Sequence, residues 1–192
     1  MVKSVAELLG SGRYNIIHTQ NPFLKQIFLE EAIKTEMPVI YLDFDLLYSG
    51  YVGMGVVRPQ PNATCLRVYP ESLLAILART AAVISENQCM VVLDSLNGFD
   101  SMLGSGRMLI SYLMILHTMA VQSRSLLVCP YTAGIAGRQI LYPSGTIPQR
   151  MGRASMINLR ETEGGVVAEL LGDGLSAKAS VALEYKRLQT PL

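Results

Sequence analysis

Three aspartates stand at positions where a side chain can take part in chemistry, because each lies at the end of an apolar run. Asp43 and Asp45 end the run VIYLDFD, and Asp94 ends the run CMVVLD. Short apolar runs of this kind are typical of strands buried on both faces of a parallel sheet. Carboxylates are common groups in acid–base and metal chemistry. At the end of a strand they can equally cap the next helix or solvate the edge of the sheet.

Arginine is concentrated in one stretch of the chain. Residues 101–160 contain no Asp or Glu, and their six basic residues are Arg107, Arg124, Arg138, Arg150, Arg153 and Arg160. Guanidinium groups suit the recognition of phosphate, so this stretch can form an anion-facing surface. The alternative is that much of it is core helix and strand, where acidic residues are scarce in any case.

Composition and the remaining reactive side chains narrow the class of protein. The 192 residues are half apolar and carry a formal net charge of +1, so we expect one domain over residues 1–192. The apolar run Met108–Val121 is shorter than the roughly 20 residues of a membrane-spanning helix. The three cysteines are not clustered and the first residues do not form a signal peptide, so we expect a cytoplasmic protein. His18 and His117 lack companions at metal-ligand spacing, and we expect no metal site.

Segments typical of strands and of helices alternate along the chain. Asn21-Pro22 is a favourable helix start, with an N-cap residue followed by proline at the first helical position. We expect helices over residues 22–36, 71–86 and 108–122, and strands over residues 14–18, 39–45, 64–69, 89–93, 125–129, 154–161, 166–173 and 180–188. Glycine-rich or proline-rich connections are expected at residues 49–62, 98–106 and 132–152. The alternation predicts a mostly parallel sheet that is completed by antiparallel strands.

The order of these parts resembles the RecA/RadA/KaiC-type ATPase core, from about Val5 to Leu188. Three segments carry the resemblance: the opening ELLGSGRYNIIH, the run CMVVLD followed by Ser95, and GRASMINLRETEGGVVAELL followed by ASVALEY. The resemblance implies a RecA-like P-loop NTPase fold, with a mostly parallel central sheet flanked by helices and antiparallel C-terminal strands. It also implies a paralogue of the archaeal RadA or KaiC-like type with a degenerate Walker A motif.

The Walker A motif is where the chain departs from this pattern. A phosphate loop reads G-x-x-x-x-G-K-[ST], but the corresponding segment here is HTQNPFLKQ. Aligning Lys25 with the motif's lysine places Thr19 and Leu24 at the two glycines. Aligning Asn21-Pro22 with the Lys-Thr pair shortens the loop, and we favour this second alignment because Asn-Pro suits a helix start. In both alignments the phosphate cradle is missing, so bound Mg-ATP is disfavoured and no cofactor is expected. The vestigial nucleotide loop is then Thr19, Gln20, Asn21 and Lys25.

The resemblance also assigns the aspartates. Asp94 corresponds to the Walker B aspartate, and Asp43 and Asp45 correspond to the family's D-x-E carboxylates, so Asp45 and Asp94 are the candidate catalytic residues. Asp45 is one methylene shorter than the glutamate that polarises the attacking water. Tyr131 or Pro130 replaces the polar sensor group that follows the next strand. Without a phosphate loop there is little metal to bind, so for Asp94 we favour a structural role, and we expect little or no ATPase activity.

Two loops contact DNA in the recombinases that the chain resembles. The corresponding stretches are residues 97–108 and 132–152, and the second is rich in Gly and lacks acidic residues. Arginine for phosphate and an aromatic ring for base stacking make a contact with single-stranded DNA plausible in chemical terms. A surface loop without a ligand is the alternative. The candidate nucleic-acid-binding residues are Arg107, Arg138, Tyr142, Arg150 and Arg153.

Together these features lead us to expect a non-hydrolysing or weakly active RecA-family paralogue. It would be an accessory factor in DNA recombination and repair, acting through single-stranded DNA or through an active RecA-family recombinase as partner. A homo- or hetero-oligomer is expected, but not a filament, because the Phe-x-x-Ala docking motif is absent. One alternative is a RecA-fold scaffold subunit of an Elongator-like RNA-modification complex. Another is an ATPase that uses an unconventional phosphate loop.

Overall fold

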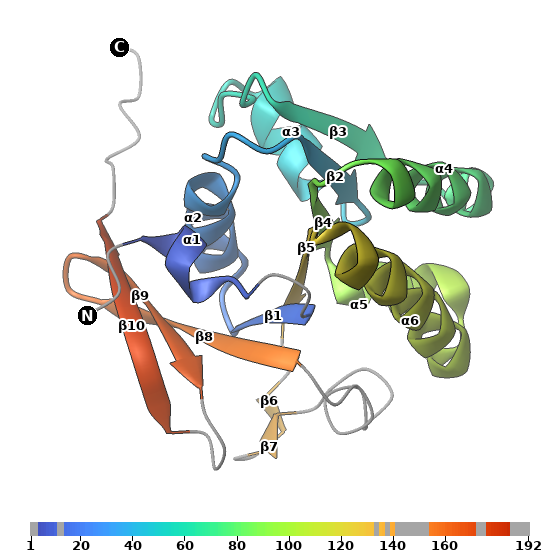
Figure 1. Cartoon of the computed structure of the whole chain (residues 1–192). Coiled ribbons are helices and arrows are strands. Elements are labelled where there is room, and N and C mark those ends of the chain that lie inside the picture. The colour runs from blue at the N-terminus through green and yellow to red at the C-terminus, as the bar shows by residue number, and fades with distance from the viewer. Residues whose placement is uncertain are drawn as a thin grey trace.

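An eight-stranded sheet runs through the centre of the molecule (Figure 1). The structure is a computed structural model, and it describes residues 4–10, 14–132, 135–136, 139–140, 154–171 and 176–184. Its strand order is β10-β9-β8-β1-β5-β4-β2-β3. The strands are β1 (Tyr14–Thr19), β2 (Val39–Asp43), β3 (Ala63–Arg67), β4 (Met90–Asp94), β5 (Leu126–Thr132), β8 (Ala154–Thr162), β9 (Gly165–Leu171) and β10 (Ala177–Glu184). Two short strands, β6 (Ile135–Ala136) and β7 (Gln139–Ile140), pair separately.

The sheet is parallel from β3 to β8 and antiparallel beyond it. β1 pairs in parallel with both β5 and β8, and β4 does so with β5 and β2. The tight connection between β8 and β9, and the pairing of β9 with β10, make the C-terminal part antiparallel. The predicted fold class, a mostly parallel sheet with antiparallel C-terminal strands, is therefore confirmed.

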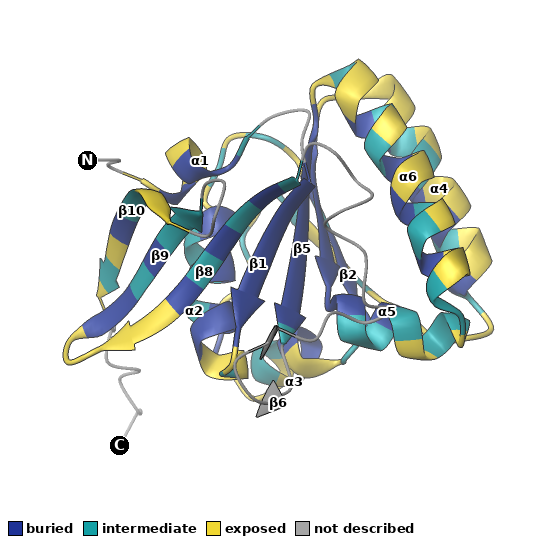
Figure 2. Cartoon of the chain, turned by 90° about the horizontal axis from the view of Figure 1, so that it is seen from below, coloured by how far each residue is buried: buried dark blue, intermediate teal, exposed yellow. Residues whose placement is uncertain are grey.

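Helices cover both faces of the parallel strands and form two apolar cores. One core lies between the sheet and α4 (Leu73–Glu86), α5 (Leu96–Leu103) and α6 (Gly106–Ser123). The other lies between the sheet and α1 (Val5–Leu8), α2 (Pro22–Ala32) and α3 (Leu47–Gly53). As a result, the central strands β1, β5 and β2 are buried along nearly their whole length, as Figure 2 shows. Burial on both faces explains why these strands read as continuous apolar runs.

Two segments expected as connections are helical in part. α3 overlaps the beginning of the expected connection at residues 49–62, and α5 overlaps the expected glycine-containing loop at residues 98–106. Gly98 lies inside α5, and a Cβ at this position would lie only 2.2 Å from the Oδ1 atom of Asp45. Here glycine serves a close approach between two elements rather than a turn, and so it misled the sequence-based prediction.

The apolar run Met108–Val121 lies within α6. Its leucines and one alanine face the sheet, and the buried residues are Leu109, Leu113, Leu116 and Ala120. Within the described part of the chain, no helix has both the length and the apolar character needed to cross a membrane.

Candidate site at the carboxyl ends of the parallel strands

The parallel pairing brings the candidate aspartates together at one edge of the sheet. Asp43 and Asp94 are direct register partners at the ends of β2 and β4. Tyr41 and Val92, two residues earlier on the same strands, belong to the core beneath α2. Because side chains on a strand alternate, Asp43 and Asp94 point to the same face of the sheet as Tyr41 and Val92. In parallel α/β sheets this edge is where ligands usually bind.

Lys25, in the first turns of α2, reaches into this edge and pairs with two aspartates. Its Nζ atom lies 2.5 Å from Oδ1 of Asp94 and 3.7 Å from Oδ2 of Asp45. The lysine side chain is 2% exposed and that of Asp94 is 0% exposed, whereas Asp45 is 25% exposed. Among the ion pairs of the described residues, only Lys25–Asp94 has both side chains buried. An ammonium group is therefore held between Asp45 and Asp94.

The second oxygen of Asp94 is also engaged. The hydroxyl of Tyr41 donates a hydrogen bond to Oδ2 of Asp94 over 2.5 Å. Burial raises the pKa of Asp94 above that of an ordinary carboxyl, while Lys25 and Tyr41 oppose the rise. Burial and the neighbouring Asp94 in turn raise the pKa of Tyr41 well above its usual value. Both oxygens of Asp94 thus already have partners within the chain.

Asp94 does not cap the helix that follows it, in contrast to one of the structural roles expected for it. The N-cap of α5 is Ser95, whose hydroxyl accepts a hydrogen bond from the backbone N–H of Gly98. It is Asp43 that has the capping role. Its Oδ2 atom accepts hydrogen bonds from the backbone N–H of Ser49, at 2.7 Å, and from the hydroxyl of Ser49 in α3. The three aspartates therefore have different tasks: Asp43 anchors α3, Asp94 is buried in an ion pair, and Asp45 is partly open to solvent.

α2 begins at Pro22, as the Asn-Pro pair predicts. The side chain of Asn21 caps the helix by accepting a hydrogen bond from the backbone N–H of Phe23 at 2.9 Å. Only Gln20 and Asn21 separate the end of β1 from this helix. The connection between strand and helix is thus short, as expected from the alignment of Asn21-Pro22 with the Lys-Thr pair.

The backbone N–H groups at this helix start are all occupied. The backbone N–H of Asn21 donates to the hydroxyl of Thr19 at 3.1 Å, and the N–H groups of Leu24 and Lys25 donate to the carbonyl of Asn21. Pro22 has no N–H. From residue 21 to residue 25, therefore, no backbone donor is left to point at a ligand. Of the vestigial loop residues, Thr19 and Lys25 are buried, and Gln20 is exposed.

The structure describes only part of the expected nucleic-acid surface. Arg107 is exposed at the start of α6. Arg138, Tyr142, Arg150 and Arg153 lie outside the described residues. The first of the two expected DNA loops is largely helical, since residues 96–103 form α5. The side chain of Asn97 binds the backbone N–H and carbonyl of Thr132, each at 2.9 Å, and so connects α5 to the end of β5.

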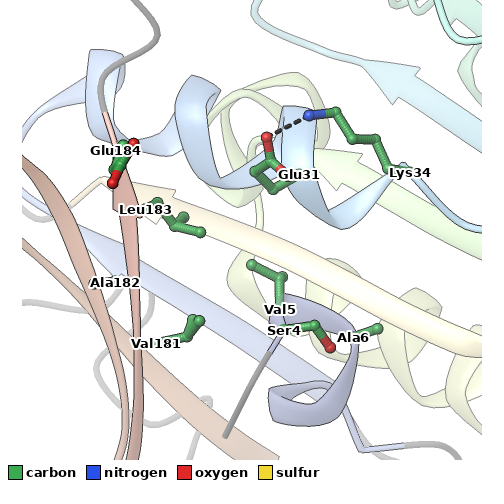
Figure 3. A pocket seen from close by; sticks show the side chains of 9 residues that line it. All are labelled: Ser4, Val5, Ala6, Glu31, Lys34, Val181, Ala182, Leu183 and Glu184. Carbon is green, nitrogen blue, oxygen red and sulfur yellow. Dashed lines mark hydrogen bonds and ion pairs between the residues drawn. The ribbon is translucent and has the colours of Figure 1, made fainter.

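The described residues contain no group of three or more His, Cys, Asp or Glu side chains that could hold a metal ion. A cavity of about 410 Å³ lies elsewhere, between α1, the end of α2 and the edge strand β10 (Figure 3). Aliphatic side chains such as Val5 and Val181 line it, together with the ion pair between Glu31 and Lys34. It contains none of the predicted site residues.

The partners of Asp94 were missed by sequence reasoning. The sequence pattern indicates Lys25 only as a remnant of the phosphate loop and Tyr41 only as part of a buried strand. A signal for Lys25 exists, because position 25 shares the helical spacing of Phe28, Leu29 and Ala32, which face the core. A lysine at such a position needs a buried acidic partner. No comparable signal identifies Tyr41.

Comparison with known proteins finds no matching family model and no matching curated protein. Solved structures do match, among them two that align with nearly the whole chain. The crystal structure of the RadB recombinase matches with a TM-score of 0.65 at 13% identity, over 95% of this chain and 93% of that chain. A KaiC-like protein from the hyperthermophilic archaeon Pyrococcus horikoshii OT3 matches with a TM-score of 0.55 at 14% identity, over 95% and 91% of the two chains. At such identities the likeness establishes the architecture: the chain has the RecA-like α/β fold.

Proposed function

We propose that this chain is a RecA-family paralogue with a degenerate Walker A loop and little or no ATPase activity. In this proposal it is an accessory factor in DNA recombination and repair, acting through single-stranded DNA or through an active RecA-type partner. The observation that carries the proposal is the start of α2. Each backbone N–H between residues 21 and 25 already has an acceptor in the chain, and the Lys25 ammonium is turned inward to Asp94.

A phosphate loop works in the opposite way. Its backbone N–H groups point at the phosphates, its lysine neutralises their charge, and its Ser or Thr hydroxyl binds Mg²⁺. Here the side chain and the carbonyl of Asn21 accept hydrogen bonds from the backbone N–H groups at the helix start, and Pro22 has no backbone N–H. The hydroxyl of Thr19 is engaged with the backbone of Asn21, to whose carbonyl it donates at 3.0 Å. The residues present therefore do not fit Mg-ATP in the manner of a phosphate loop, and we derive no catalytic step through it.

Likeness in fold and the distribution of charge support the second part of the proposal. One of the structural neighbours is a recombinase. The stretch at residues 101–160 has six arginines and no acidic residue, and Arg107 is exposed within it. Exposed arginines in a stretch without acidic residues favour association with the phosphate backbone of a nucleic acid, and the binding should weaken strongly with salt.

The nucleotide part is tested by titrating Mg-ATP into the purified chain in a calorimeter and by measuring phosphate release. We expect no saturable heat and no turnover. The opposite outcome, turnover that is lost in both Asp45→Asn and Asp94→Asn, would establish the alternative of an unconventional ATPase. Because the calorimeter measures binding directly, weak binding without turnover is distinguished from a closed site.

The DNA part is tested by fluorescence anisotropy with a single-stranded oligonucleotide over a series of salt concentrations. We expect weak binding that Arg138→Ala/Arg150→Ala reduces further, and the salt slope should become smaller by about 0.7 for each phosphate that the variant no longer binds. The matched control is Arg58→Ala/Arg79→Ala, which removes two exposed arginines outside the acid-free stretch. Equal decreases in affinity for the two double variants would mean that the acid-free stretch has no special role.

The partner is tested by affinity purification of the chain from its native cell, followed by mass spectrometry. Recovery of an active RecA-type ATPase supports the proposal. Recovery of a stable hetero-oligomer that prefers tRNA to single-stranded DNA would instead support the Elongator-like scaffold. If the purified chain neither binds DNA at low salt nor associates with a recombinase, the accessory role is wrong.

A further inference from the structure

Two carboxylates, those of Asp45 and Asp94, and the ammonium group of Lys25 lie close together at the carboxyl edge of the sheet. Lys25 Nζ lies 2.5 Å from Asp94 and 3.7 Å from Asp45, and its side chain is 2% exposed. Among the described residues no other Lys or Arg forms an ion pair with either aspartate. A buried carboxylate is costly in its ionised form unless a cation is close, and in this chain the cation close to Asp94 is the side chain of Lys25 on α2.

We propose that the Lys25 ammonium takes the place of a divalent cation between Asp45 and Asp94. The carboxyl edge of the sheet is then held in one state without metal or nucleotide. This inference rests on the proposed function, since a chain that binds Mg-ATP at this edge needs the two carboxylates to be available. A metal ion entering here would meet the positive charge of Lys25 at close range, and both oxygens of Asp94 are already bound.

The same geometry predicts what happens when the ammonium is removed. The carboxyl groups of Asp45 and Asp94 would then face the space that Nζ occupied, and a divalent cation entering that space would favour their ionised forms. Mg²⁺ and Mn²⁺ are hard cations that sites with one or two carboxylates and several waters can hold. Asp45 is 25% exposed, so ions and water can reach this group from solvent. A variant that lacks the charge of Lys25 should therefore bind a divalent cation that the wild-type chain does not bind.

The test uses Mn²⁺ alone, without nucleotide. Uptake is followed by the decrease of the paramagnetic resonance signal of free Mn²⁺, and stability by thermal unfolding with and without MnCl₂. For the wild-type chain we expect no uptake and an unchanged midpoint. Lys25→Ala should bind Mn²⁺ and unfold at a higher temperature when the ion is present. Lys25→Ala/Asp45→Asn should lose this response, and Lys34→Ala, which removes an exposed lysine of the Glu31 ion pair, should not gain it.

Lys25→Asn is the second variant, because its amide can hydrogen-bond to Asp94 and its carbonyl oxygen is itself a suitable ligand. Mn²⁺ uptake by either variant, or refolding of either only when Mn²⁺ is present, supports the inference. Absence of uptake in both, or failure of both to fold in Mn²⁺, overturns it, because Lys25 would then be a packing residue. Mn²⁺ uptake by the wild-type chain that Asp94→Asn abolishes overturns it as well. No nucleotide is present, so these outcomes are independent of the ATP measurements that test the proposed function.

Discussion

Lys25 and Asp94 show how a buried ion pair can specify a site without making it reactive. Removing a carboxylate and an ammonium from water is costly, and their mutual attraction compensates only when the remaining donors and acceptors are satisfied. Here Tyr41 supplies the additional hydrogen bond to Asp94, and Asp45 supplies a second negative charge near the ammonium. The charges and hydrogen-bonding groups of Lys25 and Asp94 thus have their partners within the chain, whereas a ligand-binding site would leave such groups available to the ligand.

Breaking this pair from one side should destabilise the protein strongly. Lys25→Met removes the charge but keeps an aliphatic stem, so Asp94 is left buried without its cation. We expect the free energy of unfolding to fall by about 3–5 kcal/mol in urea denaturation. Adding Asp94→Asn should recover part of this decrease, because the amide is neutral and can still accept from Tyr41.

The control for this pair is an exposed ion pair near the end of the same helix. Lys34→Ala breaks the Glu31–Lys34 pair, whose side chains are 34% and 39% exposed, and should cost less than about 1 kcal/mol. A Lys25→Met effect as small as that of Lys34→Ala would mean that Asp94 is neutral or hydrated in the folded chain.

Gly98 in α5 lies close against Phe44 and Asp45. A Cβ on Gly98 would lie 2.2 Å from Oδ1 of Asp45 and 2.9 Å from Cβ of Phe44. Alanine favours helices by about 1 kcal/mol over glycine, yet we expect Gly98→Ala to destabilise by about 1–3 kcal/mol, because Phe44 is buried and cannot move aside. Gly50→Ala in α3 meets open space and should be neutral or stabilising. Thermal unfolding of the two variants in parallel checks the opposite signs.

At the scale of elements, the apolar runs and the helix N-cap residues in the sequence predict most of the strands and helices. The buried strands β2, β4 and β5 read as apolar runs, and Asn21-Pro22 marks the start of α2 to the residue. The sequence does not predict α5, because Gly98 is typical of a loop, although Ser95 three positions earlier is a good N-cap. α3 was missed because its N-terminal partner, Asp43, is supplied by the preceding strand.

The site could be predicted only as a location. Three aspartates at strand ends indicate one edge of a parallel sheet, and the structure places Asp43 and Asp94 opposite each other there. The pairing of Lys25 with Asp94 joins residues 69 positions apart, and it depends on how α2 crosses the sheet. No local pattern encodes that crossing. Tyr41 is still harder to predict, since its hydroxyl is one of several in the apolar core.

The N-cap of α2 provides a test at this scale. Asn21→Ala removes the acceptor for the backbone N–H of Phe23 and should lower the free energy of unfolding by about 0.5–2 kcal/mol. Asn21→Ser retains a capping oxygen and should stay close to the wild-type value. Urea denaturation of the three chains measures the difference. If Ala and Ser behave alike, the hydrogen bond at 2.9 Å adds nothing to the stability of α2.

For the whole molecule, the two apolar cores have a shared feature, which is buried tyrosine. Tyr14 lies in the core under α6, where its ring stacks on His117, and Tyr41 and Tyr48 stack on each other in the core under α2 and α3. All three are at most 1% exposed. Burial raises the pKa of each above the ordinary value of 10.0, to about 12 for Tyr48 and well above the ordinary value for Tyr14 and Tyr41.

The chain should therefore lose stability in alkali in a defined way. Each pKa is higher in the folded than in the unfolded chain, so the contribution is complete below about pH 10 and is lost as the pH rises toward the folded pKa. In that window each tyrosine should lower the free energy of unfolding by about 1.4 kcal/mol per pH unit, measured by urea denaturation at several pH values.

The control is Tyr48→Phe, which should reduce this pH dependence by the contribution of one tyrosine. It should not destabilise the chain at neutral pH, because the Tyr48 hydroxyl is buried without a hydrogen-bond partner among the described residues. A stability that stays constant up to pH 12, with tyrosinate absorbance rising before unfolding, would contradict the placement of these rings in the two cores.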